Sequence, residues 1–387
     1  MDPVAEMIWK FLEAEKSNFI ADLKSFVLIE SPSTDPESQV GAIEFLKEKY
    51  HQLNYKTIAV PGIKTGGYFF ARPKNRIKNN AIQLMIGHCD TVWPHGTLKK
   101  MPVEISDGKI RGPGVYDMKG GLMMMIYAIK TIEALDLKTE VSPVVFINSD
   151  EEIGSFESTP MIKCLAKFAD RAFVLEPSVG YDGKLKTTRK GVGKFTIKIY
   201  GKAAHAGLDP GKGASAIVEL SHVIQKLFAL NDPENGISVN VGMIDGGTRP
   251  NVIAPESRAV IDVRIPTNKD ANTVTKAILS ITPENPDIEL IIEGKIGRPP
   301  MEPTEQNQLL YQRAKNAAER LAIEIEETAA GGGSDGNTTS QFTATLDGLG
   351  ATGDGAHALH EFAFTDKLIE RTALLTLLLL EPGLNKT

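Results

Sequence analysis

Cysteine is nearly absent from this sequence. The chain of 387 residues contains two cysteines, Cys89 and Cys164. Two thiols cannot form the disulfide framework of a small secreted domain, and they favour a reducing compartment. Residues 1–26 predict an acidic amphipathic helix and lack the basic, apolar and small-residue segments of a signal peptide. We therefore expect a cytoplasmic protein, although a mature form that has lost a signal peptide would fit the same sequence.

Long apolar runs and basic blocks are also missing. The longest largely apolar run, Ala373 to Leu380, is far shorter than the roughly 20 residues that span a bilayer, and it predicts a buried helix. The net charge is −6, and no block of Lys and Arg interrupts the sequence, which argues against a nucleic-acid partner. Hydrophobic residues make up 42% and charged residues 24%, as in a folded globular protein. We expect neither membrane nor nucleic acid as a partner.

Buried strands and helices alternate in the first half of the chain. Residues 81–88, 141–149 and 171–177 are typical of buried strands, and residues 119–135 of a helix. This alternation predicts an α/β fold with a mostly parallel sheet flanked by helices. Ligand sites in such sheets gather at the carboxyl ends of the strands.

The pattern changes after residue 187. Residues 188–297 have the order β-α-β-β-α-β, beginning with a strand of alternating polarity. This order predicts a complete two-layer α+β unit. Because the helical pattern of residues 307–323 resumes the earlier style, we expect a discontinuous catalytic domain formed by residues 1–187 and 298–387. The second domain, 188–297, would be inserted in it.

Five stretches carry potential metal ligands near strand ends or in loops. They are "IGHCDTVW" with His88 and Asp90, "RGPGVYDMKGG" with Asp117, "SDEEIGS" with Glu151 and Glu152, "VLEPS" with Glu176, and "GAHALHEF" with His357 and His360. Each residue taken alone also fits a structural role, such as a turn former. Imidazole and carboxylate without thiolate suit zinc, with Mn²⁺ or Co²⁺ as alternatives. Two imidazoles and three carboxylates favour a pair of metal ions that share one carboxylate.

These stretches resemble the M20 metallopeptidases, co-catalytic dizinc enzymes that include glutamate carboxypeptidases, aminoacylases, acetylornithine deacetylases and succinyl-diaminopimelate desuccinylases. The resemblance covers nearly the whole chain and includes "GKAAHAG", "GGTRPNVIAPESRAVIDVR" and "GGGSDG". The run from "EPSVGYDGKL" through "DVR" is most similar to glutamate carboxypeptidases. The resemblance implies a zinc-peptidase type catalytic domain, an inserted lid and dimerisation domain, and a homodimer formed through that domain.

The resemblance also implies the metal ligands His88, Asp117, Glu152, Glu176 and His357. Asp117 would bridge two metal ions. His88 and Glu176 would complete one metal site, and Glu152 and His357 the other. The distance from the Glu-Phe pair that follows favours His357 over His360 as the ligand.

Two carboxylates would act beside the metals according to the same resemblance. Glu151 would be the general base, which takes a proton from the attacking water and passes it to the leaving amine. Asp90 would orient the imidazole of His88. Because neighbouring side chains diverge, Glu151 and Glu152 could do different work at one site.

The inserted domain and a glycine-rich loop would bind substrate. The resemblance implies that His205 donates to the developing oxyanion, often from the partner subunit, and that Asn251 and Arg264 hold the substrate carboxylate. Backbone N–H groups of "GGGSDG", including Gly332, could approach the same carboxylate. Structural alternatives remain for each: a turn histidine for His205, a surface cross-strand ion pair with Asp262 for Arg264, and a flexible loop for the glycine-rich stretch.

The function that the resemblance implies is hydrolysis of an amide next to a free carboxylate in a small peptide or N-acyl amino acid. A glutamate-type carboxypeptidase is preferred, an N-acyl-amino-acid amidohydrolase is the alternative, and a non-catalytic binding dimer is disfavoured by the presence of Glu151 and Asp117. Lys184 or Arg189 would read an acidic side chain. The glycines of "GLGATG" lack the helix of a dinucleotide site, and Cys89 is expected in the core rather than as a nucleophile.

Overall fold

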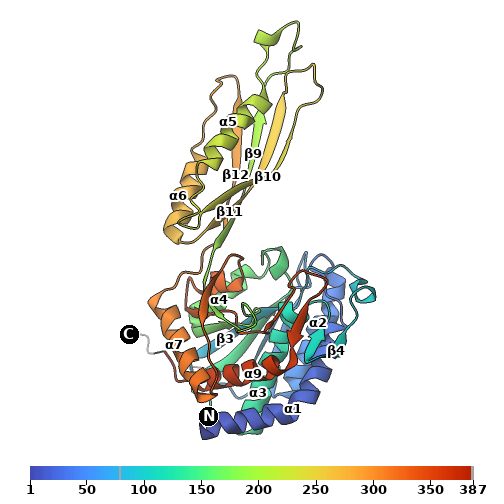
Figure 1. Cartoon of the computed structure of the whole chain (residues 1–387), viewed down its shortest axis with the longest axis vertical. Coiled ribbons are helices and arrows are strands. Elements are labelled where there is room, and N and C mark those ends of the chain that lie inside the picture. Colours follow the sequence, from blue (N-terminus) through green and yellow to red (C-terminus); the bar gives the residue numbers. More distant parts are fainter. Residues whose placement is uncertain (78–79, 385–387) are drawn as a thin grey trace. The chain divides into compact units, whose positions relative to one another are not determined.

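The chain folds into two compact units. The computed structural model describes residues 1–77 and 80–384. Unit 1 comprises Met1–Thr188, Pro303–Ala329 and the chain from Ser334 onward, and unit 2 comprises Arg189–Glu302 and Ala330–Gly333 (Figure 1). The borders expected from the sequence lie within five residues of these, except that 330–333, which contains Gly332, groups with unit 2 and not with the catalytic domain.

A six-stranded sheet with the order β1-β2-β6-β3-β7-β14 forms the centre of unit 1. Its strands are β1 Tyr55–Val60, β2 Tyr68–Pro73, β3 Ile82–His88, β6 Ser142–Asn148, β7 Ala169–Val174 and β14 Ala344–Leu346. Strands β6, β3, β7 and β14 run parallel, whereas β1 and β2 form an antiparallel edge. The predicted α/β class with a mostly parallel sheet is therefore confirmed.

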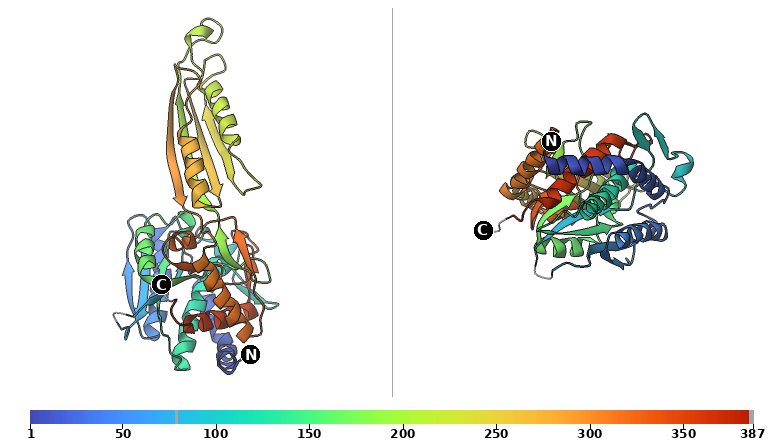
Figure 2. Two further views of the ribbon diagram at one scale, coloured as in Figure 1. Left: turned by 90° about the vertical axis from the view of Figure 1, so that its left-hand side faces the viewer. Right: turned by 90° about the horizontal axis from the view of Figure 1, so that it is seen from below.

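Helices cover both faces of this sheet. They are α1 Pro3–Val27, α2 Pro36–Gln52, α3 Gly120–Ala134, α4 Thr159–Phe168, α7 Glu305–Arg320, α8 Asp335–Thr339 and α9 Thr365–Leu380. Figure 2 shows helices on both sides of the sheet. Successive strand residues alternate between the faces: Met85 belongs to the core that α1, α3 and α9 fill, and Leu84 and Ile86 belong to the core beneath α4. The predicted buried helix at the C-terminus is part of α9.

Two smaller sheets complete unit 1. One has the order β15-β16-β5-β4, and the other pairs β13 with β8. Their strands are β4 Glu104–Ser106, β5 Lys109–Arg111, β8 Leu185–Arg189, β13 Glu327–Ala330, β15 Gly353–Asp354 and β16 Phe362–Phe364. The first sheet brings the segment before Asp117 against the segment that carries His357, because β5 pairs with β16.

Unit 2 is a two-layer α+β unit with the predicted order β-α-β-β-α-β. Its elements are β9 Gly191–Tyr200, α5 Ala216–Phe228, β10 Ser238–Gly246, β11 Glu256–Ile265, α6 Asn268–Leu279 and β12 Glu289–Arg298. The sheet has the order β10-β11-β9-β12 and all its pairs are antiparallel. Alternate residues of β9 (Phe195, Ile197 and Ile199) are buried with residues of α5 and α6 in one core.

Arg171 anchors the end of the C-terminal helix. This β7 side chain is fully buried, and its guanidinium donates to the carbonyl oxygens of Glu381 and Pro382 at 2.6 Å and of Leu378 at 3.4 Å. It also donates to the side chain of Gln83 at 2.8 and 3.0 Å. The positive charge thus lies at the negative end of the α9 dipole. None of the helices in the described residues combines the length and apolar content needed to cross a membrane.

We expect Arg171→Met to lower the free energy of unfolding by roughly 3–5 kcal/mol, because several buried acceptors lose their donor together. Urea unfolding followed by circular dichroism measures the change. Arg313→Met is the matched control: Arg313 is half-buried, and its hydrogen bond to the carbonyl of Pro382 is exposed, so its loss should cost less than about 1 kcal/mol. Equal effects of the two substitutions would contradict the anchoring role.

Candidate metal centre

Three neighbouring strands end at the same edge of the unit 1 sheet. His88 is the last residue of β3 and pairs in register with Asn148, the last residue of β6. The loop after β6 carries Glu151 and Glu152 in a short 3₁₀ helix, Glu151–Ile153, and Glu176 follows β7 two residues after its end. The carboxyl ends of parallel strands thus bring one imidazole and three carboxylates to one edge.

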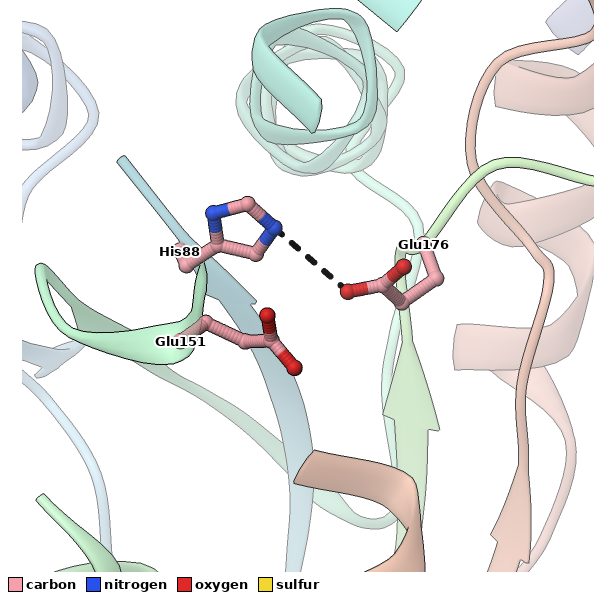
Figure 3. A group of neighbouring side chains, drawn as sticks. All are labelled: His88, Glu151 and Glu176. Carbon is pink, nitrogen blue, oxygen red and sulfur yellow. Dashed lines mark ion pairs between the residues drawn. The ribbon is translucent and has the colours of Figure 1, made fainter. Parts of the chain in front are cut away.

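The imidazole of His88 faces two carboxylates. Its Nε2 lies 3.3 Å from Oδ1 of Asp117 and 3.5 Å from Oε1 of Glu176. One carboxylate oxygen of Glu151 lies within 4.8 Å of ligand atoms of both His88 and Glu176. Figure 3 shows the side chains of His88, Glu151 and Glu176 pointing toward one another.

A second imidazole faces the other side of Asp117. Nε2 of His357 lies 3.2 Å from Oε2 of Glu152 and 3.6 Å from Oδ2 of Asp117. The two oxygens of Asp117 therefore face different histidines. His357 has a φ of +62°, a left-handed conformation that costs a non-glycine residue roughly 1–3 kcal/mol and is typical of functional sites. The ring of His357 makes both contacts, although His357 and His360 are both exposed.

The donor atoms fit two divalent metal ions. Two atoms bound to one tetrahedral zinc at about 2.0–2.2 Å are about 3.3–3.5 Å apart, and the imidazole–carboxylate separations of 3.2–3.6 Å match that spacing. Within residues 1–77 and 80–384, six buried side-chain atoms lack a hydrogen-bond partner. Three of the six belong to this cluster: His88 Nε2, Asp117 Oδ1 and Glu152 Oε1. Buried polar atoms without partners are rare, and a pair of cations would satisfy these three.

The electrostatics of the cluster also favour bound cations. Burial lowers the pKa of His88, but the carboxylates of Asp117, Asp90 and Glu176 outweigh this and raise it well above its ordinary value. The carboxylate of Glu152 raises the pKa of His357 to about 9. Burial raises the pKa of Glu152 itself. The site therefore holds an excess of buried negative charge, which positive charge must offset.

Asp90 holds two parts of the cluster together. Its backbone carbonyl oxygen lies 2.9 Å from Nδ1 of His88, closer than its carboxylate at 3.4 Å. The carboxylate accepts the backbone N–H groups of Glu151 at 3.3 Å and Glu152 at 3.2 Å, and the hydroxyl of Ser33 at 2.7 Å. The residue expected to orient His88 thus also fixes the loop of the two glutamates. Ser33 was missed because a single serine 57 residues from Asp90 gives no sequence signal.

Two further acids position the loop after β6. The carboxylate of Asp150 accepts the backbone N–H of Glu157 at 2.8 Å and the hydroxyl of Ser158 at 2.6 Å. Asp335, from "GGGSDG", accepts the side-chain N–H of Asn148 at 2.7 Å and the hydroxyl of Ser155 at 2.5 Å. The aspartate of the glycine-rich motif therefore supports the glutamate loop, a role that the sequence did not suggest.

Glu361 fixes the turn that carries Asp117. From the sequence, Glu361 served only to choose between His357 and His360 as the ligand. Its buried carboxylate accepts the backbone N–H groups of Gly114 at 2.9 Å, Tyr116 at 2.9 Å and Asp117 at 3.0 Å. It also accepts the indole N–H of Trp93 at 2.9 Å. Burial raises the pKa of Glu361 to about 7 against the effect of these donors.

The substrate-binding candidates of unit 2 lie at two ends of one strand. His205 and Asn251 are exposed and occupy adjacent loops, because His205 forms a bridge with Val252 and the N–H of Ala206 donates to the carbonyl of Asn251. Arg264 lies near the other end of β11. Its guanidinium binds both oxygens of Asp262 at 2.8 and 3.1 Å. This ion pair is the structural alternative expected for Arg264, but both residues lie on the same strand, β11.

The other residues expected to bind substrate, Gly332, Arg189 and Lys184, have partners within the chain. The carbonyl of Gly332 accepts the guanidinium of Arg189 at 3.1 Å within unit 2, and the buried Arg189 is thereby engaged. Lys184 lies 2.7 Å from Glu326 and 3.4 Å from Asp182. Both basic side chains therefore have partners within the chain.

The discarded motifs have structural roles. Cys89 belongs to the core of unit 1, and burial raises the pKa of its thiol to about 12, so it is not a nucleophile at neutral pH. The glycines of "GLGATG" lie between β14 and the first residue of β15, where no helix begins.

An α/β unit with imidazoles and carboxylates converging at its strand ends, in a chain interrupted by an α+β unit, has the architecture of a metal-dependent enzyme. A family model described as peptidase family M20/M25/M40 matches residues 84–381, and the chain belongs to this family. The resemblance read from the sequence is thus confirmed.

Known proteins agree with this assignment. The chain is 28% identical over 352 residues to carboxypeptidase G2 of Pseudomonas sp. (strain RS-16), with 89% of this chain and 84% of that protein covered. It is 24% identical over 343 residues to succinyl-diaminopimelate desuccinylase of Aliarcobacter butzleri, with 83% and 88% covered. The crystal structure of aminopeptidase PepT from Bacillus cereus shares the fold, with a TM-score of 0.77, 20% identity, and 94% and 98% covered.

We expect the metal-free protein to bind two divalent ions per chain, and Asp117→Asn to weaken both sites because its two oxygens face different histidines. Glu176→Gln should weaken one site only, since Glu176 contacts His88. Zinc titration of the chelator-treated protein, with bound metal counted by mass spectrometry, distinguishes these outcomes. Asp117→Asn protein that still binds one ion with native affinity would contradict the shared carboxylate.

Proposed function

We propose that this chain hydrolyses an amide or peptide bond next to a free C-terminal carboxylate, as a glutamate-type carboxypeptidase. The observation that carries the proposal is Asp117, whose two oxygens face two histidines, together with Glu151 close to His88 and Glu176. The similarity to a protein named carboxypeptidase G2 supports the type of bond. The substrate would be a small peptide or an N-acyl amino acid.

The ligand set of the proposal follows the contacts. His88 and Glu176 would hold one ion, Glu152 and His357 would hold the other, and Asp117 would contribute to both sites. Zinc suits these imidazole and carboxylate donors, with Mn²⁺ or Co²⁺ as alternatives. When bound, such ions supply the Lewis acidity that activates water and polarises the scissile carbonyl.

Glu151 is the general base of this proposal. Consecutive residues of a 3₁₀ helix point about 120° apart, so Glu152 can face His357 while Glu151 faces the space beside His88 and Glu176. Its backbone N–H is fixed by Asp90. From there Glu151 takes a proton from the attacking water and returns it to the leaving amine.

A homodimer formed through unit 2 completes the proposed site. Tyr200 pairs with Glu256 at one end of β11, where the His205 and Asn251 loops lie, and Val192 pairs with Arg264 at the other. Eight residues of strand span about 26 Å, too far for both ends to hold one small substrate. Arg264 of one copy, released from Asp262, would bind the substrate carboxylate together with His205 and Asn251 of the other.

Unit 2 has a surface suited to this pairing. Strand β10 lies at the edge of its sheet, and the side chains of Met243 and Ile244 on it are each 62% exposed. An edge strand with exposed apolar residues favours pairing with another chain.

A cytoplasmic location is part of the proposal, supported by two cysteines that are free.

The second candidate function is N-acyl-amino-acid amidohydrolase, since the chain is also similar to a desuccinylase. Both reactions use the same centre and differ in what lies beyond the amide. Hydrolysis of N-acyl and dipeptide substrates ending in Glu, Asp, Leu, Arg or Gly, with added Zn²⁺ or Mn²⁺, separates them. Preference for dipeptides or acyl-glutamates ending in Glu supports the carboxypeptidase, and preference for simple N-acyl groups whatever the amino acid supports the alternative.

We expect Glu151→Gln to lower kcat by about 10²–10⁴-fold while the protein keeps both metal ions, because an amide cannot accept the proton. Glu152→Gln is the matched neighbour and should lose metal as well as activity. Steady-state hydrolysis and metal content are measured on the same samples. Near-normal turnover by Glu151→Gln would exclude it as the base.

We expect His205→Ala to slow turnover with little change in metal content, since the imidazole contacts no metal ligand in the proposal. If His205 acts on the partner's substrate, mixing His205→Ala with Glu151→Gln should restore part of the activity, because each mixed dimer holds one intact site. Unmixed variants at the same total concentration are the controls. Absence of any rescue in dimers shown to exchange subunits would argue for action within one chain.

A further inference from the structure

The buried carboxylate of Glu361 accepts four hydrogen bonds, two at each oxygen. Oε1 accepts the N–H groups of Tyr116 and Asp117, and Oε2 accepts the N–H of Gly114 and the indole N–H of Trp93, at 2.9–3.0 Å. The residue is 1% exposed. Burying a carboxylate costs free energy unless hydrogen-bond donors satisfy it. The four donors are therefore what allows Glu361 to be buried here.

The donors belong to an irregular turn. Gly114 has a φ of +74°, and Asp117 has non-helical backbone angles within the segment Val115–Lys119. Backbone N–H groups outside regular structure still need acceptors, and one carboxylate supplies the acceptor for three of them here. The conformation of this turn decides where the side chain of Asp117 points.

Glu361 also connects this turn to two other ligand segments. It follows His357 by four residues, and its own N–H donates to Ala358 at 3.0 Å in the turn between them. The indole of Trp93 comes from the segment that begins with His88. The side chain of Glu361 therefore connects the three segments that carry His88, His357 and Asp117.

We propose that Glu361 is a positioning residue that sets Asp117 for both metal ions by holding the backbone of residues 114–117. The inference rests on the metal centre of the proposed function. A carboxylate accepts at both oxygens, whereas the amide of glutamine has one acceptor oxygen and an NH₂ group that would face N–H donors. Glu361→Gln therefore keeps the size of the side chain and removes its chemistry.

The test compares Glu361→Gln with Glu219→Gln. Glu219 is an equally buried carboxylate, 2% exposed, in α5 of unit 2. It accepts the backbone N–H groups of Glu284 at 2.8 Å and Asn285 at 3.2 Å. Both variants leave buried N–H donors short of an acceptor, so a loss of stability alone does not separate them.

Two measurements without substrate do separate them. In the metal-free full-length chain, amide hydrogen exchange of residues 114–117 should be at least about tenfold faster in Glu361→Gln, and unchanged in Glu219→Gln, where residues 284–285 exchange faster instead. Competition with a chromophoric chelator should show zinc affinity lowered about 10–100-fold in Glu361→Gln and native in Glu219→Gln. Saturating zinc should recover part of kcat in Glu361→Gln.

Native zinc affinity in folded Glu361→Gln protein would overturn the inference, as would an equal loss in Glu219→Gln. If Glu361→Gln does not fold, Glu361→Asp gives the same test: it keeps the charge but is one methylene too short to hold all four donors, and native zinc affinity would again overturn the inference. If the wild-type chain binds no metal, the proposed metal centre itself fails. If it binds two ions with affinity independent of residue 361, only the positioning role fails.

Discussion

The structure of unit 1 depends on one electrostatic constraint, the concentration of carboxylates around two imidazoles at the end of a buried sheet. Asp117, Glu152 and Glu176 each lie within 3.6 Å of a histidine nitrogen, and the pKa of each histidine is raised by its carboxylate neighbours. Without counter-charge such a cluster would oppose folding. Two divalent cations turn the same charges into ligands, and binding them would then stabilise the folded state.

The scaffold around this cluster reuses one device, a buried carboxylate that accepts backbone N–H groups. Asp90 holds the loop of Glu151 and Glu152, Asp150 holds the far end of that loop, and Glu361 holds the turn of Asp117. A carboxylate has two oxygens and several acceptor directions, so it can fix irregular backbone that no sheet or helix would hold. Precision at the ligands therefore comes from acids that are not ligands.

How much of this the sequence could predict follows from the range of the interactions. The parallel sheet and the β-α-β-β-α-β unit rest on local periodicity, and His88, Glu151 and Glu176 lie near strand ends that periodicity locates. Ser33, Asp335 and Glu361 act on residues 57 to 268 positions away, and no local pattern marks such contacts. The sequence also does not decide whether Arg264 binds Asp262 or a substrate carboxylate, because the guanidinium geometry suits either carboxylate.

Three consecutive acids after β6 show how local geometry divides one kind of side chain into several roles. Asp150 precedes the 3₁₀ helix and turns inward to backbone N–H and hydroxyl donors. Glu152 faces His357, and Glu151 faces His88 and Glu176. The tight turn separates their directions by about 120° per residue, so each of the three side chains faces a different set of neighbours. A regular strand would have pointed Asp150 and Glu152 to the same side. The irregular turn thus points the adjacent glutamates in different directions, as the proposed roles of Glu152 as ligand and Glu151 as base require.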